Sequence, residues 1–257
     1  MFYIDSHCHL TDKKYVGAKS VVENAEEAGV KIIVDAGWSY QSAICATENA
    51  EKFESVYCTV GIHPSESLIY TDDELLKLEN RLSRKKCLAV GEIGLDYHYD
   101  GTDKPSQREL FEKQICLADK HKLPFVVHSR DSSRDMLDVL KTNKNKLSNG
   151  FLMHCFSESA EQAKNYLDLG AYFSFGGVIT FKNCKKEDIV RAIPTDRILL
   201  ETDSPYLAPE PLRGSVNEPK NVVLIYEKTA RILNLKSEVL QELIADNFFA
   251  LFKKASL

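Results

Sequence analysis

The chain has 257 residues and a formal net charge of −5, and hydrophobic and charged residues make up 44% and 28% of it. This length fits one large domain, and the ordinary composition excludes a disordered chain. The acidic balance excludes a broad basic surface for gripping long nucleic acid. We therefore expect a single folded domain over residues 1–257, in which any phosphate group is held by a few local cations or by metal ions.

Short apolar segments alternate with amphipathic ones along the chain. Eight apolar segments predict strands at residues 2–5, 31–37, 56–64, 87–96, 124–131, 150–157, 171–177 and 197–205. The other segments repeat apolar residues at steps of three and four. They predict helices at residues 15–29, 42–53, 71–85, 106–122, 132–144, 159–170, 185–193, 221–234 and 237–254.

Regular alternation of strand and helix predicts a parallel sheet, because each helix returns the chain to the same edge. The count of eight favours an α/β fold that closes as a single, slightly distorted (β/α)8 TIM barrel over an open doubly wound sheet. No Gly-x-Gly-x-x-Gly motif follows the first strand, which weakens the open alternative. The segment 237–254 is expected to be an extra helix that packs on the outside.

The N-terminal residues and the cysteines indicate the compartment. The start "MFYIDSHCH" lacks the basic and apolar regions of a secretory signal, and no apolar segment is long enough to span a membrane. The seven cysteines are scattered and contain no Cys-x-x-Cys pair, which is typical of reduced thiols. We expect a cytoplasmic protein with no membrane association and no obligate protein partner.

Residues that can bind metal lie near the carboxyl ends of the predicted strands. His7 and His9 are two positions apart, so on a strand they share one face with Asp5. The later candidates are His63, Glu92, Asp96, His128, His154 and Asp203. In a barrel these strand ends converge on one face. A single histidine or aspartate at such a position has an ordinary explanation as a turn or surface residue, but their recurrence favours a metal site.

Glu92 is the most informative of these residues. It lies inside the apolar run "LAVGEIGL", where burial of an unpaired carboxylate costs several kcal/mol, roughly. The candidate ligands exceed the three of a typical catalytic zinc site and suit two divalent ions, zinc, magnesium or manganese. We expect Glu92 to bridge them, with the other ligands divided between a first ion and a second: His7, His9 and Asp203, then His128 and His154.

Six motifs resemble those of the TatD-type metal-dependent deoxyribonucleases, a branch of the amidohydrolase-like barrels. In chain order they are "DSHCHL", "VGIHP", "VGEIGLDY", "VVHSRD", "HCFS" and "LLETDSPYLAP", and the resemblance extends from Asp5 to about Pro219. It implies a TIM-type barrel that hydrolyses DNA phosphodiesters, commonly as a 3′-to-5′ exonuclease on single-stranded DNA. It supports the same six metal ligands, and it implies that His63 and Arg213 contact substrate phosphate.

Two departures from this family's pattern affect the expected cleft. Glu158 follows "HCFS" where the family usually has glycine, and it is expected to narrow the cleft or change its charge. Ser215 and Val216 stand where basic residues are common, so weaker phosphate binding is expected. Cys8 and Cys155 adjoin candidate ligands, and strand alternation would point both away from the site.

The expected reaction is hydrolysis by a metal-activated water. Glu92 and Asp203 are the expected catalytic carboxylates, with Asp203 as the general base. His63 is expected to contact phosphate or to protonate the leaving oxygen, and Tyr97 and Tyr206 are candidates for stacking a base. Arg130 and Asp131 are expected to support the ligands. The substrate is then a single-stranded DNA end or a small phosphodiester.

Two other functional classes remain open. One is a related metal hydrolase that acts on a small amide, ester or lactone, or on an aminoacyl-RNA. Many such enzymes bridge their ions with a modified lysine, and here the fourth strand offers Glu92 instead. The other is a binding protein with a structural metal, although structural zinc sites are closed by four ligands that are often cysteines.

Overall fold

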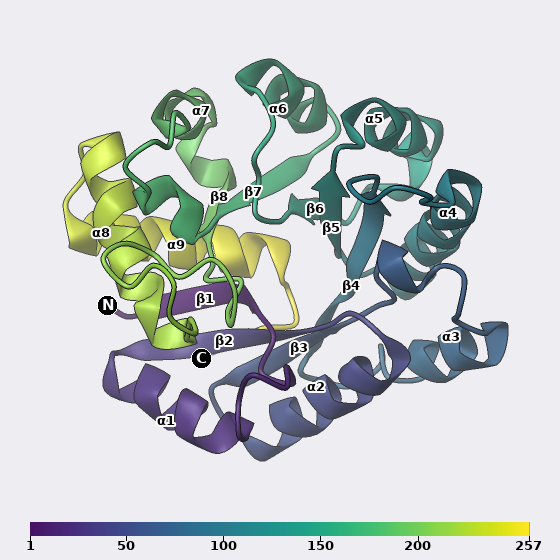
Figure 1. Cartoon of the computed structure of the whole chain (residues 1–257), viewed down its shortest axis with the longest axis horizontal. Coiled ribbons are helices and arrows are strands. Elements are labelled where there is room, and N and C mark those ends of the chain that lie inside the picture. Colours follow the sequence, from purple (N-terminus) through teal and green to yellow (C-terminus); the bar gives the residue numbers. More distant parts are fainter. Residues whose placement is uncertain (257) are drawn as a thin grey trace.

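Eight parallel strands pair in chain order in the computed structural model, which describes residues 1–256 (Figure 1). Each strand pairs with the next in parallel. They are β1 (Tyr3–Cys8), β2 (Val30–Gly37), β3 (Val56–Val60), β4 (Cys87–Asp96), β5 (Phe125–Arg130), β6 (Phe151–Met153), β7 (Ala171–Phe175) and β8 (Ile198–Leu200). The predicted (β/α)8 TIM barrel is confirmed.

Helices surround the strands. They are α1 (Ala18–Glu27), α2 (Tyr40–Lys52), α3 (Asp72–Glu79), α4 (Lys104–His121), α5 (Ser133–Thr142), α6 (Ala160–Leu167), α7 (Glu187–Ala192), α8 (Val222–Leu233) and α9 (Ser237–Leu251). Ser39, Thr71, Asp103 and Ser159 cap α2, α3, α4 and α6 by accepting a backbone N–H of the first turn. Among residues 1–256, no helix combines the length and the apolar character needed to cross a bilayer.

The barrel closes between β1 and β8 largely through side chains and the residues that follow β8. Asp5 accepts hydrogen bonds from the Thr202 N–H at 2.8 Å and from the Thr202 hydroxyl at 2.5 Å. The Asp203 N–H donates to the His7 carbonyl at 3.0 Å. Near the start of β1, the Tyr226 hydroxyl of α8 accepts the N–H of Ile4 and donates to its carbonyl. These contacts join β1 and β8, the two ends of the sheet order among residues 1–256.

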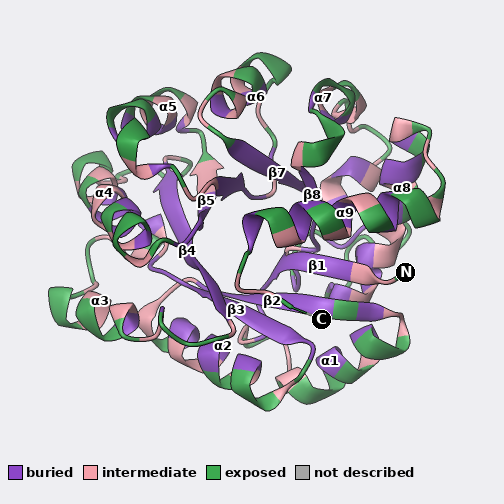
Figure 2. Ribbon diagram, turned by 180° about the vertical axis from the view of Figure 1, so that it is seen from behind, coloured by how far each residue is buried: buried purple, intermediate pink, exposed green. Residues whose placement is uncertain are grey.

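The C-terminal helix α9 lies across the amino-terminal end of the barrel (Figure 2). Asn247 donates to the carbonyls of Thr195 and Ile198 at 2.7 and 2.8 Å, where β8 begins. The Ser256 carbonyl, which follows α9, accepts from the Tyr57 hydroxyl at the start of β3. The extra helix was correctly predicted, and it packs on the outside of the barrel, with its apolar residues buried against the strand starts.

The observed strand limits change where the site residues stand. Glu92 lies inside β4 and His128 inside β5, not at their ends. β3, β6 and β8 end earlier than predicted, so His63, His154 and Asp203 follow their strands in loops. The carboxyl halves of the strands and the loops that follow them together form the face where active sites of this fold are built.

Candidate metal centre

A cavity of about 900 Å³ opens at the carboxyl ends of the strands. Five of the six predicted metal ligands line it, together with other polar residues from the loops: His9, Glu92, His128, His154 and Asp203. The sixth, His7, is fully buried, and its ring stacks on that of His154 with the centroids 4.2 Å apart. Residues from both ends of the sequence therefore meet in one place.

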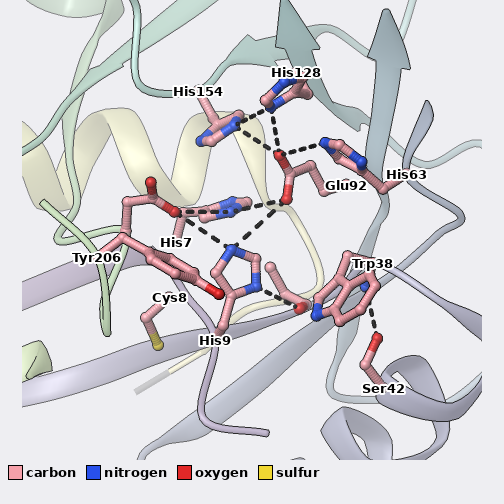
Figure 3. A network of polar contacts seen from close by, with 12 residues as sticks. His7, Cys8, His9, Trp38, Ser42, His63, Glu92, His128, His154 and Tyr206 are labelled. Atoms are coloured by element: carbon pink, nitrogen blue, oxygen red, sulfur yellow. Dashed lines mark hydrogen bonds and ion pairs between the residues drawn. The ribbon is translucent and has the colours of Figure 1, made fainter. Parts of the chain in front are cut away.

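Glu92 occupies the centre of this cluster (Figure 3). Its Oε1 lies 2.8 Å from His128 Nδ1 and 2.9 Å from His154 Nε2. Its Oε2 lies 3.5 Å from His7 Nε2 and 3.7 Å from His9 Nε2. Burial opposes ionisation of Glu92, but His154 and the hydrogen bond to His128 outweigh it and hold its pKa well below the usual range. The buried carboxylate thus has partners on both oxygens.

Asp203 faces the same cluster from the loop after β8. Its Oδ1 lies 3.3 Å from His9 Nε2 and 4.0 Å from His7 Nε2. Its backbone is in the left-handed region, with φ of 52°, a conformation that costs about 1–3 kcal/mol in a residue other than glycine. Strain of this kind is retained where surrounding contacts impose it, and it often marks functional positions.

Three histidines are oriented by a second contact on the ring nitrogen that points away from the cluster. His9 Nδ1 donates to the Ala36 carbonyl at 3.0 Å, so its Nε2 is left facing Glu92 and Asp203. The other two orienting contacts run from His128 Nε2 to Asp96 at 3.0 Å and from His154 Nδ1 to Glu201 at 3.3 Å. Such contacts are typical around metal-binding histidines.

Glu201 is a residue that the sequence analysis missed. It is fully buried directly after β8, and the Ser174 hydroxyl donates to its second oxygen. The signal that singled out Glu92, a carboxylate beside an apolar run, was also present in "LLETD".

His7 provides a test of whether a metal fits. Neither of its ring nitrogens has a hydrogen-bond partner within residues 1–256, although the side chain is fully buried. Burying an unpaired polar atom is costly, and a cation would satisfy one of the two nitrogens. Burial and the nearby His154 lower the pKa of His7, so its ring is neutral, as a metal ligand must be. The donor set of imidazoles and carboxylates also suits a divalent ion.

In the absence of a cation, protons on the histidines balance the carboxylates. Burial disfavours a charged His9, but the hydrogen bond to Asp203 and the charge of Glu92 outweigh it and raise the pKa of His9 to about 9. The same competition, with Asp96 or Glu92 as the stabilising partner, raises the pKa values of His128 and His154. Because a coordinating nitrogen must be unprotonated, a metal ion displaces these protons when it binds.

His63 lies within the cluster. Its Nε2 is 3.7 Å from Glu92 Oε1, and its ring centroid is 4.4 Å from that of His128. Burial and the charge of His128 lower the pKa of His63 to about 3, so its ring is neutral at pH 7. Its Nδ1 accepts the Ser65 N–H at 3.1 Å, which leaves the ring proton on Nε2. His63 can therefore donate a hydrogen bond but carries no charge, and its contact with substrate stays a prediction.

The structure does not bring Tyr97 and Arg213 to the cavity. The Tyr97 hydroxyl donates to Asp135 at 3.0 Å, and the Lys104 ammonium lies 4.4 Å from the centre of its ring. Arg213 is exposed, with its guanidinium 4.3 Å above the Phe181 ring. Neither residue lines the cavity. Contacts with Asp135 and Lys104 hold Tyr97, and packing on Phe181 holds Arg213, outside the cavity.

Other residues supply the positive charge and the aromatic side chains at the cavity. Arg130 is the one arginine or lysine among the residues that line the cavity, all of them within 1–256. The aromatic side chains on the lining are Trp38, Tyr99 and Tyr206. Tyr206 was a candidate from the sequence, whereas Trp38 and Tyr99 were missed. Arg130, first assigned to support the ligands, is exposed and lines the cavity, with its guanidinium 5.7 Å from the centre of the Tyr99 ring.

The departures and cysteines noted in the sequence are also located. Glu158 accepts hydrogen bonds from Ser129 at 2.7 Å and Tyr166 at 3.1 Å and does not line the cavity, so it does not narrow it. Ser215 and Val216 are exposed in the loop after β8. Cys8 donates to the Val34 carbonyl, away from the cluster. The prediction for Cys155 is wrong: it follows β6 with φ of 45°, alternation no longer applies, and it lines the cavity.

Comparisons with known proteins agree with this geometry. Residues 4–253 match the model of a family described as TatD related DNase. The uncharacterized metal-dependent hydrolase YabD of Bacillus subtilis is 37% identical over 251 residues, which cover 97% of this chain and 98% of the relative. The uncharacterized metal-dependent hydrolase YcfH of Escherichia coli K12 is 35% identical over 258 residues, with 98% and 96% covered. A crystal structure of YJJV, a TatD homologue from E. coli K12, superposes with a TM-score of 0.91 at 28% identity and covers 98% of each chain.

Proposed function

This chain belongs to the TatD-related DNase family of metal-dependent hydrolases, and from that premise we propose that it cleaves DNA phosphodiesters at single-stranded ends, in the 3′-to-5′ direction. The observation that carries the proposal is the position of Glu92, whose two oxygens face two separate groups of imidazoles beside an open cavity. A carboxylate with one oxygen toward each group is placed to be shared by two ions, as hydrolases with a pair of metal ions can use it.

The residues that would hold two divalent ions are those predicted from the sequence. Glu92 Oε2 faces one group, His7 and His9, to which Asp203 adds a carboxylate. Glu92 Oε1 faces the other group, His128 and His154. When bound, zinc, magnesium or manganese at these positions supplies the Lewis acidity that activates water and neutralises the phosphate oxygens.

Asp203 is suited to act as the general base. Burial opposes its ionisation, but the hydrogen bond with His9 and the charge of His154 lower its pKa, so it is a carboxylate at neutral pH. Its side chain also remains partly open to the cavity, with 15% of its surface exposed. From there it can orient a water molecule and accept its proton, while the neutral His63 can donate its Nε2–H to the substrate.

The cavity supports a short substrate segment. Its volume of about 900 Å³ is that of a small-ligand site. Arg130 supplies one cation for a phosphate, and Asp100 and Asp103 add negative charge to the lining. A continuous nucleic-acid backbone would meet repulsion here, whereas a strand end needs room for few phosphates. The same features favour a small ester or amide as the second candidate substrate.

The proposed location is the cytoplasm. All seven cysteines are free thiols in the described part of the chain, which supports a reducing compartment.

The decisive experiment removes metal from the purified protein and restores magnesium, manganese or zinc separately. Each form is assayed on a 5′-labelled single-stranded oligonucleotide, a nitrophenyl ester and an anilide. We expect at least one ion to restore stepwise shortening of the oligonucleotide from its 3′ end. Hydrolysis of the ester or the amide without cleavage of DNA would instead select the second candidate.

A matched pair of variants controls this assay. Glu92→Gln removes the shared carboxylate, and we expect bound metal and turnover to fall by at least about 100-fold, with the fold retained. Glu158→Gln changes a carboxylate that lies outside the cavity, and full activity is expected. Full activity of Glu92→Gln would contradict the bridging role.

A further inference from the structure

The single tryptophan of the chain, Trp38, stands on the rim of the cavity. β2 ends at Gly37 and α2 begins at Tyr40, so a very short turn holds it. A Cβ on Gly37 would lie 2.5 Å from the Ala43 Cα, so glycine lets α2 pack directly against the end of the strand. Short turns at this end of a barrel usually carry residues that meet substrate.

The backbone of Trp38 is tied down on both sides. Its N–H donates to the Ser42 hydroxyl at 2.9 Å, and its carbonyl accepts the His63 N–H at 2.8 Å. Trp38 therefore keeps a fixed position between α2 and the metal cluster. Two residues earlier, the Ala36 carbonyl accepts the proton of His9 Nδ1. One turn thus orients a candidate metal ligand and presents an aromatic ring.

The indole ring is only half-buried. Within residues 1–256, the hydrogen bonds of Trp38 all run through its backbone, so no polar contact of the ring explains its place. Aromatic residues that only fill a core are covered by it, whereas Trp38 is partly exposed and lines the cavity. A flat apolar surface beside a phosphodiester site matches the face of a nucleobase.

Tyr206 offers a second aromatic surface. Its ring centroid lies 6.2 Å from that of His9, and 42% of the residue is exposed. Its hydroxyl donates to Asp12 at 2.5 Å, and the Lys14 ammonium, which does not line the cavity, lies 4.0 Å from the centre of its ring. Figure 3 shows the rings of Trp38 and Tyr206 to either side of His9.

We propose that Trp38 is the base-stacking residue of this site: an unpaired nucleobase of the substrate lies on the indole, with Tyr206 as a second contact, while the adjoining phosphate reaches the cluster around Glu92. The inference rests on the proposed function, because it takes a nucleic-acid end as the substrate. Stacking accepts any base, since every base has a flat face. Bases in a duplex are already stacked and paired, so this contact also selects single strands.

Fluorescence tests the proposal without relying on turnover, because all tryptophan emission comes from Trp38. The metal-loaded protein is titrated with a phosphorothioate tetrathymidylate and with a tetramer of the same charge in which every base is absent. We expect the thymidylate to quench the emission and the abasic tetramer to bind more weakly without quenching. Binding is measured independently by the anisotropy of 5′-fluorescein forms of both tetramers.

Two variants make the result specific. Trp38→Ala should raise the Kd of the tetrathymidylate roughly 5- to 100-fold and leave the Kd of the abasic tetramer within about twofold. Trp38→Phe keeps a flat ring and should recover most of the affinity, which separates stacking from a folding defect. Circular dichroism confirms that both variants are folded.

The possible failures are distinguishable. Thymidylate that binds without quenching, or a Trp38→Ala variant that weakens both tetramers equally, overturns the role of Trp38 and leaves the proposed function standing. If neither tetramer binds and no oligonucleotide is cleaved with any metal, the proposed function fails and this inference fails with it.

Discussion

Glu92 lies at the centre of the candidate site, because its position inside β4 places one oxygen toward each group of histidines. A carboxylate in a buried strand is stable only if charged or hydrogen-bonding partners surround it. The sequence therefore identified Glu92 because burying its carboxylate without a partner would be energetically unfavourable. The same signal was present at Glu201, but only the structure shows the contact with His154 that explains its burial.

Arg130 and Arg213 differ in a way that predicts their contributions to binding. Arg130 lines the cavity, whereas Arg213 stacks on Phe181 outside it. Loss of a charge-assisted contact costs about 1.5–3 kcal/mol, so Arg130→Ala should raise the KM for a single-stranded oligonucleotide at least 10-fold. Arg213→Ala should change it less than about threefold.

Steady-state kinetics on the oligonucleotide and on a neutral ester checks this prediction. The ester has no phosphate, so Arg130→Ala should leave its KM nearly unchanged. A larger effect of Arg213→Ala on the oligonucleotide would restore the role that family resemblance implied for it.

At the scale of elements, Asp35 on β2 joins three parts of the structure. Its side chain is fully buried and accepts hydrogen bonds from the Leu10 N–H and from Asn49 of α2, both at 2.9 Å. Leu10 directly follows His9, so this carboxylate helps to hold the loop that carries His9, a candidate metal ligand. Burial raises the pKa of Asp35 to about 6, because these contacts only partly offset the loss of water.

This shift predicts how stability depends on pH. The folded state binds the Asp35 proton more tightly than the unfolded chain, whose aspartate has a pKa near 3.9. The resulting stabilisation is complete below about pH 4 and is lost as the pH rises to about 6. Relative to Asp35→Asn, the wild-type free energy of unfolding should fall by at most about 3 kcal/mol between pH 4 and pH 7.

Urea unfolding of both proteins across this range measures the difference, in which the titrations common to both proteins cancel. Asparagine retains an acceptor for the Leu10 N–H. A difference that stays constant, or that grows as the pH rises, would contradict a raised pKa at this position.

At the scale of the whole molecule, the two ends of the barrel have separate tasks. The carboxyl end of the strands holds the cavity and the histidines. The amino end is covered by α9, whose Phe248 is fully buried and whose Asn247 anchors it beneath β8. In barrels of this type the first end serves chemistry and the second serves stability.

Asn247→Ala tests this division. It removes two hydrogen bonds and leaves the carbonyl of the buried Ile198 without this donor, while the exposed Thr195 can bond water instead, so the free energy of unfolding should fall by about 1–3 kcal/mol. Asn80→Ala at an exposed position should change it by less than about 0.5 kcal/mol. Metal content and the KM of the folded Asn247→Ala protein should equal those of the wild type, and a loss of bound metal would show that the two ends are coupled.

The features that could be predicted from the sequence depend on local periodicity and on residue type. Alternation of strands and helices identified the barrel, the two-residue strand repeat placed His7 and His9 together, and histidines near the strand ends marked the cluster. These patterns can be recognised in a sequence because every strand and every helix directs its side chains with the same regular repeat.

Tertiary structure decided which residues of the loops and of the strand ends reach the cavity. Trp38, in the turn after β2, lines the cavity, whereas Tyr97 does not. Arg130, at the exposed end of β5, lines it, whereas Arg213 does not. The loop after β6 also turns Cys155 inward through a left-handed backbone conformation. The direction of such a side chain is set by packing against residues distant in the chain, such as Asp135 for Tyr97. Local sequence patterns do not contain those contacts. The sequence alone therefore determined the fold and the position of the candidate metal ligands, but not which side chains line the surface proposed to meet a substrate.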